Sequence, residues 1–248
     1  MKLACNYCPE AELLVREGRI DVDYFKIPAL DCQADLLNDP GACEGFAGRA
    51  GAVWPLLLHG WYPSMERLIE ISKTPGISFH PDLDSSTVSG VVAFIQSLQE
   101  KYAHLDFISV ENSGAIEAQP LVLSEIVRES GCTFLLDISH AWCTSRRLGM
   151  DFWAYLAQLP LERLYEIHIN GWAEKGDDIM CHVKTNEQGY QILKELLTVC
   201  SPKIVTIEYG RENDRLGCGI PVMRPGEVNE RAMEEIAEQV GRIREIIS

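Results

Sequence analysis

The chain has 248 residues, a formal net charge of −15 and nine cysteines, and its composition is ordinary for a soluble globular protein. No apolar run approaches the ~18 residues of a membrane span, and the N-terminus is too polar and acidic for a signal peptide. We therefore expect a cytoplasmic protein without membrane contacts. The negative charge argues mildly against a broad nucleic-acid surface, although a bound metal would add positive charge locally.

The cysteines are expected to be reduced thiols, because no secretion signal is present. Cys5 and Cys8 form a CxxC pair. No second pair follows at the spacing of a zinc site, so we expect a structural or incidental role for this one.

Short apolar runs alternate with helical patterns along the chain. Eight runs are predicted to be strands: Leu3–Cys5, Tyr24–Ile27, Pro55–Leu58, Ile77–Phe79, Phe107–Val110, the apolar part of Phe134–His140, Leu164–Ile167 and Ile204–Ile207. Helices are predicted at Pro9–Glu17, Ala34–Asn38, Pro63–Lys73, Ser86–Ala103 (capped by Asp84 or Ser85), Pro120–Glu129, Leu148–Gln158, from a cap at Asn186 to Val199, and from a cap at Asn229 to Ile247.

This alternation predicts a parallel sheet with right-handed crossovers. Eight units in a chain close to the roughly 250 residues of a TIM barrel favour a closed barrel over an open sheet. We therefore predict the α/β class and a single (β/α)8 TIM barrel that spans residues 1–248 as one domain.

Polar side chains follow most of these strands, at the end where a barrel opens. One such residue is usually a helix cap or a satisfied polar group, but a barrel aims all of them at one cavity. Imidazoles and carboxylates crowded together repel and desolvate one another unless a cation joins them, and this donor set suits Zn, Mn or Fe. The predicted metal ligands are His59, His80, Glu111, Asp137, His140, His168, Asp178, His182 and Glu208.

Nine candidate ligands exceed what one ion uses, because one ion needs about four protein ligands. We therefore predict two or three divalent ions per chain. Glu111 follows the central strand of the series and is the natural bridge between ions.

The pattern resembles the xylose-isomerase-like barrel superfamily over nearly the whole chain. Its sugar isomerases and epimerases share a four-ligand core that Glu111, Asp137, His168 and Glu208 match. The remaining ligands resemble the trinuclear set of apurinic endonuclease IV, whose HP, EN(S/T)xG and DxxHA motifs recur here from His80, Glu111 and Asp137. That resemblance implies one ion at His59, His80 and Glu111, a second at the four-ligand core, and a third at His140, Asp178 and His182.

A second resemblance, equally close, is to multinuclear non-heme iron oxidases that modify cysteine-containing peptides. Leu56–Ser64, Val110–Ser113 and Glu166–Gly171 look like their strand ends. That family tends to carry Asn at the position of His140. Both relatives use a tight Asp-x-His where Asp178 and His182 stand four apart, so Asp177 could replace Asp178, and Cys181 could enter the site as a softer ligand.

Three reactions remain open, with phosphoester hydrolysis first. In hydrolysis Glu111 would bridge two or three ions while Glu208 or Asp137 orients the nucleophile. In sugar or sugar-phosphate isomerisation, Glu111 and Glu208 would exchange protons across the reacting carbon beside one ion. His59 and His80 would then be explained only as hydrogen-bond partners of the sugar hydroxyls. In oxidation at iron, the substrate would be a peptide or small thiol, which a partner protein could present. A metal-buffering barrel without turnover is the non-enzymatic alternative.

Several further residues are candidates for substrate binding. The aromatic ones could stack on a ring but could equally fill the core, and the arginines could hold an anion but could also be surface residues. The candidates are Asn112, Asn170, Arg146, Arg211, Trp61, Trp142 and Trp172.

Overall fold

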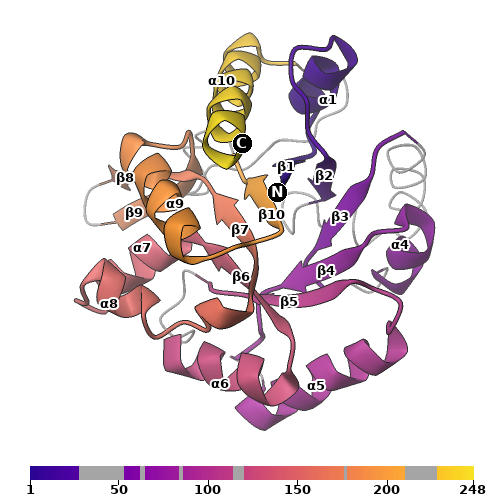
Figure 1. Ribbon diagram of the computed structural model, residues 1–248, viewed down its shortest axis with the longest axis vertical. Coiled ribbons are helices and arrows are strands. Elements are labelled where there is room, and N and C mark those ends of the chain that lie inside the picture. The colour runs from indigo at the N-terminus through magenta and orange to yellow at the C-terminus, as the bar shows by residue number, and fades with distance from the viewer. Residues whose placement is uncertain (28–52, 62–64, 84–85, 114–119, 176–177, 210–227) are drawn as a thin grey trace.

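The computed structural model is a closed barrel of parallel strands surrounded by helices (Figure 1). It describes the chain apart from residues 28–52, 62–64, 84–85, 114–119, 176–177 and 210–227. Around the barrel the strand order is β1, β10, β7, β6, β5, β4, β3 and β2, and β1 closes the ring by pairing with both β10 and β2. The predicted (β/α)8 barrel is confirmed.

The barrel strands coincide with the predicted apolar runs. They are β1 (Lys2–Asn6), β2 (Tyr24–Ile27), β3 (Leu56–His59), β4 (Gly76–Phe79), β5 (Phe107–Glu111), β6 (Thr133–Asp137), β7 (Leu164–Ile169) and β10 (Ile204–Ile207). All neighbouring pairs are parallel, so their C-terminal ends lie on one face of the barrel.

Alternate residues of the strands fill the barrel interior in layers. The lowest layer is apolar and contains Ala4, Leu57, Phe107 and Ile204. Two residues further along the strands the interior becomes polar, as at Ser109 and Thr206, and both of these side chains are fully buried. The same alternation brings Glu111 and Glu208 to the open end of the barrel.

The helices cover the outside of the barrel, and their apolar faces pack against the strands to form the main hydrophobic core. Within the described part of the chain, no helix is long and apolar enough to cross a lipid bilayer. The helices are α1 (Pro9–Arg16), α4 (Met65–Ser72), α5 (Val88–Lys101), α6 (Pro120–Ser130), α7 (Ile138–Arg147), α8 (Phe152–Leu156), α9 (Glu187–Val199) and α10 (Glu230–Ile247), with a 3-10 turn at Leu161–Arg163.

The predicted helix caps are confirmed at two helices and wrong at a third. Asn186 and Asn229 accept hydrogen bonds from first-turn amides of α9 and α10. Helix α5 begins later than predicted, because Thr87 accepts the first-turn amide bond through its hydroxyl. The proposed caps Asp84 and Ser85 lie outside the described residues, as does the helix predicted at residues 34–38.

The segment after β6 differs from the prediction of a helix at 148–158. Helix α7 starts directly after the strand, because Asp137 Oδ1 accepts the amide of His140 at 2.7 Å and caps the helix. Gly149, with φ +65°, follows the C-terminal cap of α7 and stops that helix, and Asp151 caps the short helix α8. His140 therefore stands on the first turn of a helix.

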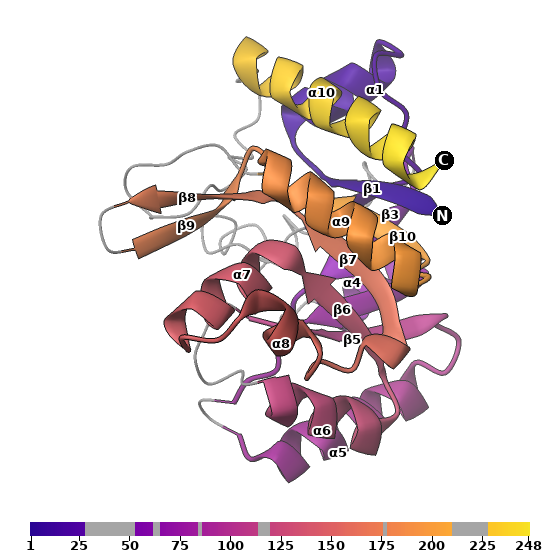
Figure 2. The same cartoon turned by 60° about the vertical axis from the view of Figure 1, so that its left-hand side comes forward.

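An antiparallel hairpin, β8 (Gly171–Lys175) and β9 (Asp178–Val183), follows β7 where the sequence predicts only a loop. Its charged residues obscured the strand pattern. Figure 2 shows the hairpin extending outwards from the barrel, and β9 contacts α7. The hairpin carries Cys181 and His182 to the barrel mouth.

The CxxC pair has the structural role expected for it. Cys5 and Cys8 are both buried thiols that form no disulfide. Cys8 caps α1, and its Sγ accepts the amide of Ala11 at 3.4 Å.

Candidate metal centre

The open end of the barrel brings most of the predicted metal ligands together. They form three groups, and within each group the potential ligand atoms lie within 4.8 Å of one another. The groups are His59, His80 and Glu111; Glu111, Asp137, His168 and Glu208; and His140, Cys181 and His182. The side chain of the predicted ligand Asp178 lies outside the described residues, as does Asp177.

Glu111 lies between the first two groups. Its Oε2 is 3.1 Å from Nε2 of His59 and 3.5 Å from Nε2 of His80, and its Oε1 is 3.1 Å from Nδ1 of His168. Burial alone would raise the pKa of Glu111, but these imidazoles hold it well below its usual value. Each oxygen of one carboxylate thus faces a different ligand group, as in a bridging ligand.

The strand register sets the second group. Asp137 of β6 pairs with His168 of β7, so the two side chains stand at the same height in the barrel. Nδ1 of His168 is 3.3 Å from Oε2 of Glu208 and 4.0 Å from Oδ2 of Asp137. All of these side chains are buried.

The donor set fits divalent metal ions. Oε2 of Glu111 is buried and accepts no hydrogen bond from the described residues, which is costly unless a cation binds it. The second group places three carboxylates around one imidazole, an excess of negative charge that a cation would neutralise. Imidazole nitrogen with carboxylate oxygen suits Zn, Mn or Fe.

Contacts behind the imidazoles orient them towards the groups. Nδ1 of His59 is 2.9 Å from Oγ of Ser78, its register partner on the neighbouring strand. Nδ1 of His140 is 3.0 Å from the carbonyl oxygen of Asn112, which accepts its N–H. Such contacts select one tautomer and leave the other ring nitrogen, Nε2 in both cases, free to bind a metal.

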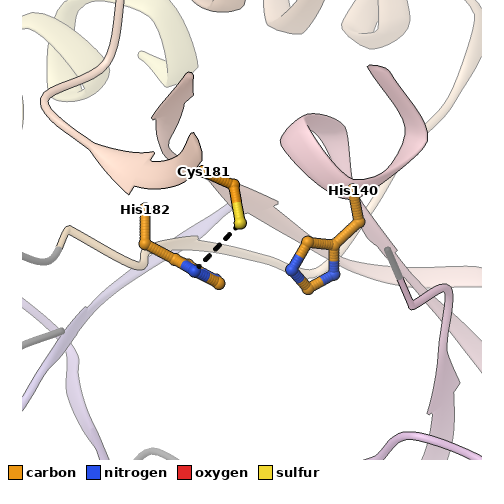
Figure 3. Close-up of side chains that lie close together, drawn as sticks. All are labelled: His140, Cys181 and His182. Carbon is orange, nitrogen blue, oxygen red and sulfur yellow. Dashed lines mark hydrogen bonds between the residues drawn. The ribbon is translucent and has the colours of Figure 1, made fainter. Parts of the chain in front are cut away.

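The groups differ in electrostatic state. Burial lowers the pKa of His59 well below its usual value, and partial removal from water lowers that of His80, which favours the neutral, metal-binding form of both imidazoles. Burial also lowers the pKa of His140, but Asp137 and Cys181 raise it to about 10. Burial raises the pKa of Cys181, but hydrogen bonds with His140 and His182 lower it to about 6. These hydrogen bonds favour the thiolate form of Cys181, which Figure 3 shows beside both imidazoles.

Three buried polar residues beneath the metal centre were missed from the sequence. Lys26 Nζ is 3.3 Å from Oε1 of Glu166 and contacts Nε2 of His168, and Thr206 donates to the same Glu166 oxygen at 2.5 Å. Burial raises the pKa of Glu166, but Lys26 lowers it to about 2. Glu166 lies 3.2 Å from Nε2 of His168, so it can accept that N–H and leave Nδ1 for the metal. A lysine and a glutamate inside two predicted buried strands were the available signals.

Asn112 and Asn170, predicted to bind substrate, are buried and hold the centre together. The Asn112 amide donates to the Asp137 carbonyl at 2.9 Å, and its Oδ1 accepts the Asp137 amide at 2.8 Å. The Asn170 amide donates to Oδ2 of Asp137 at 2.8 Å, and its Oδ1 accepts the backbone N–H of His182 at 2.9 Å. Both therefore position ligands, whether or not they also touch substrate.

Asn112→Ala is expected to destabilise the protein by about 1–3 kcal/mol for each backbone group of Asp137 left unpaired. Urea unfolding of the metal-free variant measures this loss. Asn112→Asp keeps the acceptor for the Asp137 amide but loses the donor to the Asp137 carbonyl, so it should lose less stability than Asn112→Ala. The prediction is wrong if Asn112→Ala is as stable as the wild type, or if Asn112→Asp is as unstable as Asn112→Ala.

The other predicted substrate residues lie in two places. Trp61 lines a pocket of about 480 Å³ that also contains His80 and Phe94. The rings of Trp142 and Trp172 stack with centroids 5.1 Å apart, and exposed Arg146 lines a smaller pocket beside Trp142. Arg211 lies outside the described residues. Their role in substrate binding stays a prediction.

Comparison with known proteins finds some that are similar in sequence and one that is similar in fold. A UPF0276 protein of Chromobacterium violaceum is 25% identical over 217 residues, which cover 73% of this chain and 79% of the relative. A UPF0276 protein of Anaeromyxobacter sp. is 41% identical over 54 residues, but these cover only 22% of this chain and 19% of the relative. Endonuclease IV from Thermus thermophilus shares the fold, with a TM-score of 0.53 and 15% identity over 88% of this chain and 95% of that structure.

A family model described as RiPP precursor modification enzyme MbnB/TglH/ChrH matches residues 84–216, which is more than half of the chain. The matched segment contains the whole four-residue second group, whereas His59 and His80 precede it. The suspected xylose-isomerase-like superfamily is confirmed together with the fold. The chain belongs to the MbnB/TglH/ChrH family of RiPP precursor modification enzymes.

Proposed function

We propose that this protein oxidises a cysteine-containing precursor peptide at a centre of at least two iron ions. The observation that carries the proposal is the family match over residues 84–216, which contain the whole second ligand group, combined with a buried Glu111 that faces two ligand groups. This favours the third of the reactions considered from the sequence over hydrolysis, which stood first.

The two ligand groups have different access to substrate. His59, His80 and Glu111 would hold one ion, and Glu111, Asp137, His168 and Glu208 the second. His59 and all members of the second group are buried, whereas the His80 side chain is 38% exposed. Peptide would therefore approach from the His80 side.

The pocket beside His80 suits a peptide side chain. Trp61 and Phe94 meet edge to face there, with ring centroids 5.4 Å apart, and Asp82 adds a polar edge. These residues would hold an apolar part of the peptide and exclude water, while the buried carboxylates keep the ligand set anionic. Iron bound at the centre would pass electrons from the peptide to oxygen, so that the peptide is oxidised and oxygen is reduced.

The other two reactions have weaker support. Isomerisation at one ion does not account for His59 and His80, which lie with Glu111 in a group of their own. Hydrolysis could use the same two groups. The likeness to endonuclease IV concerns the fold, however, and the net charge of −15 does not favour a nucleic-acid substrate.

Elemental analysis after anaerobic purification tests the proposal. We expect two or three iron ions per chain, and oxygen uptake that depends on a cysteine-containing precursor peptide. The same peptide with serine in place of cysteine is the control and should not stimulate uptake. Two or three zinc ions with cleavage of abasic DNA would instead support hydrolysis, and one manganese or cobalt ion with no oxygen uptake would support isomerisation.

His59→Ala and His80→Ala are each expected to remove part of the bound metal, because each takes one ligand from the first group and leaves the second group intact. Metal content per chain, measured on anaerobically purified protein, checks this. His104→Ala is the control, since His104 belongs to none of the ligand groups among the described residues. Unchanged metal content in both variants would leave a single-ion centre.

A further inference from the structure

An asparagine at the end of β1 has an amide oxygen without a partner. Asn6 is the last residue of its strand, as His59, Glu111 and Asp137 are of theirs. Its side chain belongs to a residue that is only 4% exposed, and its Oδ1 is buried and accepts no hydrogen bond from any residue that the structure describes. Burying an amide oxygen without a partner is costly, which favours a hydrogen-bond donor that reaches it from outside the chain.

The strand register directs Asn6 into the barrel mouth beside a ligand group. Ala4, two residues earlier, belongs to the lowest layer of the barrel interior, and side chains two residues apart on a strand point to the same face. Cys5 pairs with Ile207 of β10. The next residues along these parallel strands, Asn6 and Glu208, are therefore neighbours. Neighbouring strands lie about 4.8 Å apart, so Asn6 is within reach of a molecule bound at the second ligand group.

The backbone at Asn6 is held from the other side as well. Asn6 pairs with Lys26 of β2, and the amide of Tyr7 donates to the Lys26 carbonyl at 2.8 Å. The ammonium of Lys26 is directed to Glu166 and His168. The neighbouring cation is thus engaged elsewhere and leaves Oδ1 of Asn6 for another donor.

Strand β1 lies across the barrel from the carboxylate that faces two ligand groups. In the ring order β1 is four strands from β5 in either direction, so Asn6 and Glu111 lie on opposite walls of the mouth. Among the described residues, β1 and β2 contribute no member to the candidate ligand groups. A substrate atom bound at ions on the Glu111 side therefore has Asn6 on its other side.

The proposed substrate carries a matching donor. A cysteine within a peptide has a backbone N–H on the same residue as its sulfur, so the two groups are held a short distance apart. With the sulfur at the metal centre, this N–H can point to the opposite wall. The amide of asparagine also places an acceptor and a donor side by side, which matches the N–H and C=O groups of a peptide backbone.

We propose that Oδ1 of Asn6 accepts a hydrogen bond from the backbone N–H of the reacting cysteine, and that this contact selects cysteine in peptide linkage over a simple thiol. A thiol without that N–H leaves the buried Oδ1 unpaired, which is the arrangement that lets a site reject an analogue lacking a donor. The inference rests on the proposed function for its premise that a cysteine sulfur binds at the metal centre.

Two small thiol probes test the contact. N-acetyl-L-cysteine amide carries the N–H, and N-acetyl-N-methyl-L-cysteine amide lacks it. Binding is followed on the full chain loaded with cobalt, by the change in absorption when the sulfur of the probe reaches the metal, so no turnover is needed. We expect the wild type to bind the first probe about 5–100-fold more tightly, because the methyl group leaves Oδ1 unpaired.

Asn6→Ala should bind the two probes with nearly equal affinity, because the acceptor is gone and the methyl group has room. Asn6→Asp keeps an acceptor oxygen and should keep the preference for the N–H probe. Each protein is its own reference, since an effect of the substitution on folding or metal content changes both affinities alike and cancels in their ratio.

The proposal is overturned if the wild type binds both probes equally, in which case water occupies Oδ1. It is also overturned if Asn6→Ala keeps the preference or Asn6→Asp loses it. Those results would leave the proposed function standing. A wild type that binds no cobalt, or that binds cobalt but neither thiol, would remove the proposed function and the inference together.

Discussion

Glu111→Gln is expected to lower metal affinity by more than about 100-fold and to lower activity with it. Contacts that only support a ligand already contribute about 10–100-fold, and Glu111 is itself a member of both candidate ligand groups. The amide removes the negative charge and can no longer offer an oxygen to both sides. Metal content of the anaerobically purified variant, followed by iron titration, measures the loss.

Glu10→Gln is a matched control for this variant. Glu10 is also buried, but it lies on α1, and its Oε1 accepts the backbone amide of Asn229 at 3.0 Å. Glutamine keeps that acceptor, so metal content should not change. If Glu111→Gln binds as much metal as Glu10→Gln, Glu111 does not bridge two ions.

Lys26→Met is expected to destabilise the metal-free protein by about 3–5 kcal/mol. Lys26 and Glu166 are both fully buried, and removing the ammonium leaves the carboxylate without its main partner. Thr206 still donates to Glu166, but a single hydroxyl does not compensate a buried charge. Urea unfolding at neutral pH measures the change.

The double variant Lys26→Met/Glu166→Gln supplies the control. Without the buried negative charge, most of the stability lost in Lys26→Met should return, since replacing both members of a buried pair is often neutral. A double variant as unstable as Lys26→Met would show that the lysine acts through packing. Metal content should still fall in the double variant, because glutamine orients His168 less well than a carboxylate does.

The sequence predicted the barrel because each strand is a short apolar run and each crossover has helical periodicity. It also predicted that His59, Glu111 and Glu208 would meet, since parallel strands deliver their final residues to one face. Which of them fall in the same candidate ligand group depends on strand order and register, as in the pairing of Asp137 with His168. Neither can be read from spacing along the chain.

The residues that were missed or misplaced depend on distant contacts. Lys26 and Glu166 stand 140 residues apart, and only closure of the barrel makes them partners. Helix α7 starts at its cap Asp137, a residue that the prediction had used as a metal ligand and a catalytic candidate but not as a helix cap. Periodicity also did not predict the hairpin, whose pairing depends on contacts between two strands of mixed polarity.

By itself, the sequence determined the barrel, the face on which the polar residues gather and the nitrogen–oxygen character of their donors, because all three follow from local patterns repeated in every unit. Only the tertiary structure decided that Glu111 stands between two groups and that Cys181, where Asp178 was predicted, joins His140 and His182. The physical reason is that a one-residue bulge at His182 reverses the side to which a side chain points, and that bulge is stabilised by Asn170 across the mouth of the barrel.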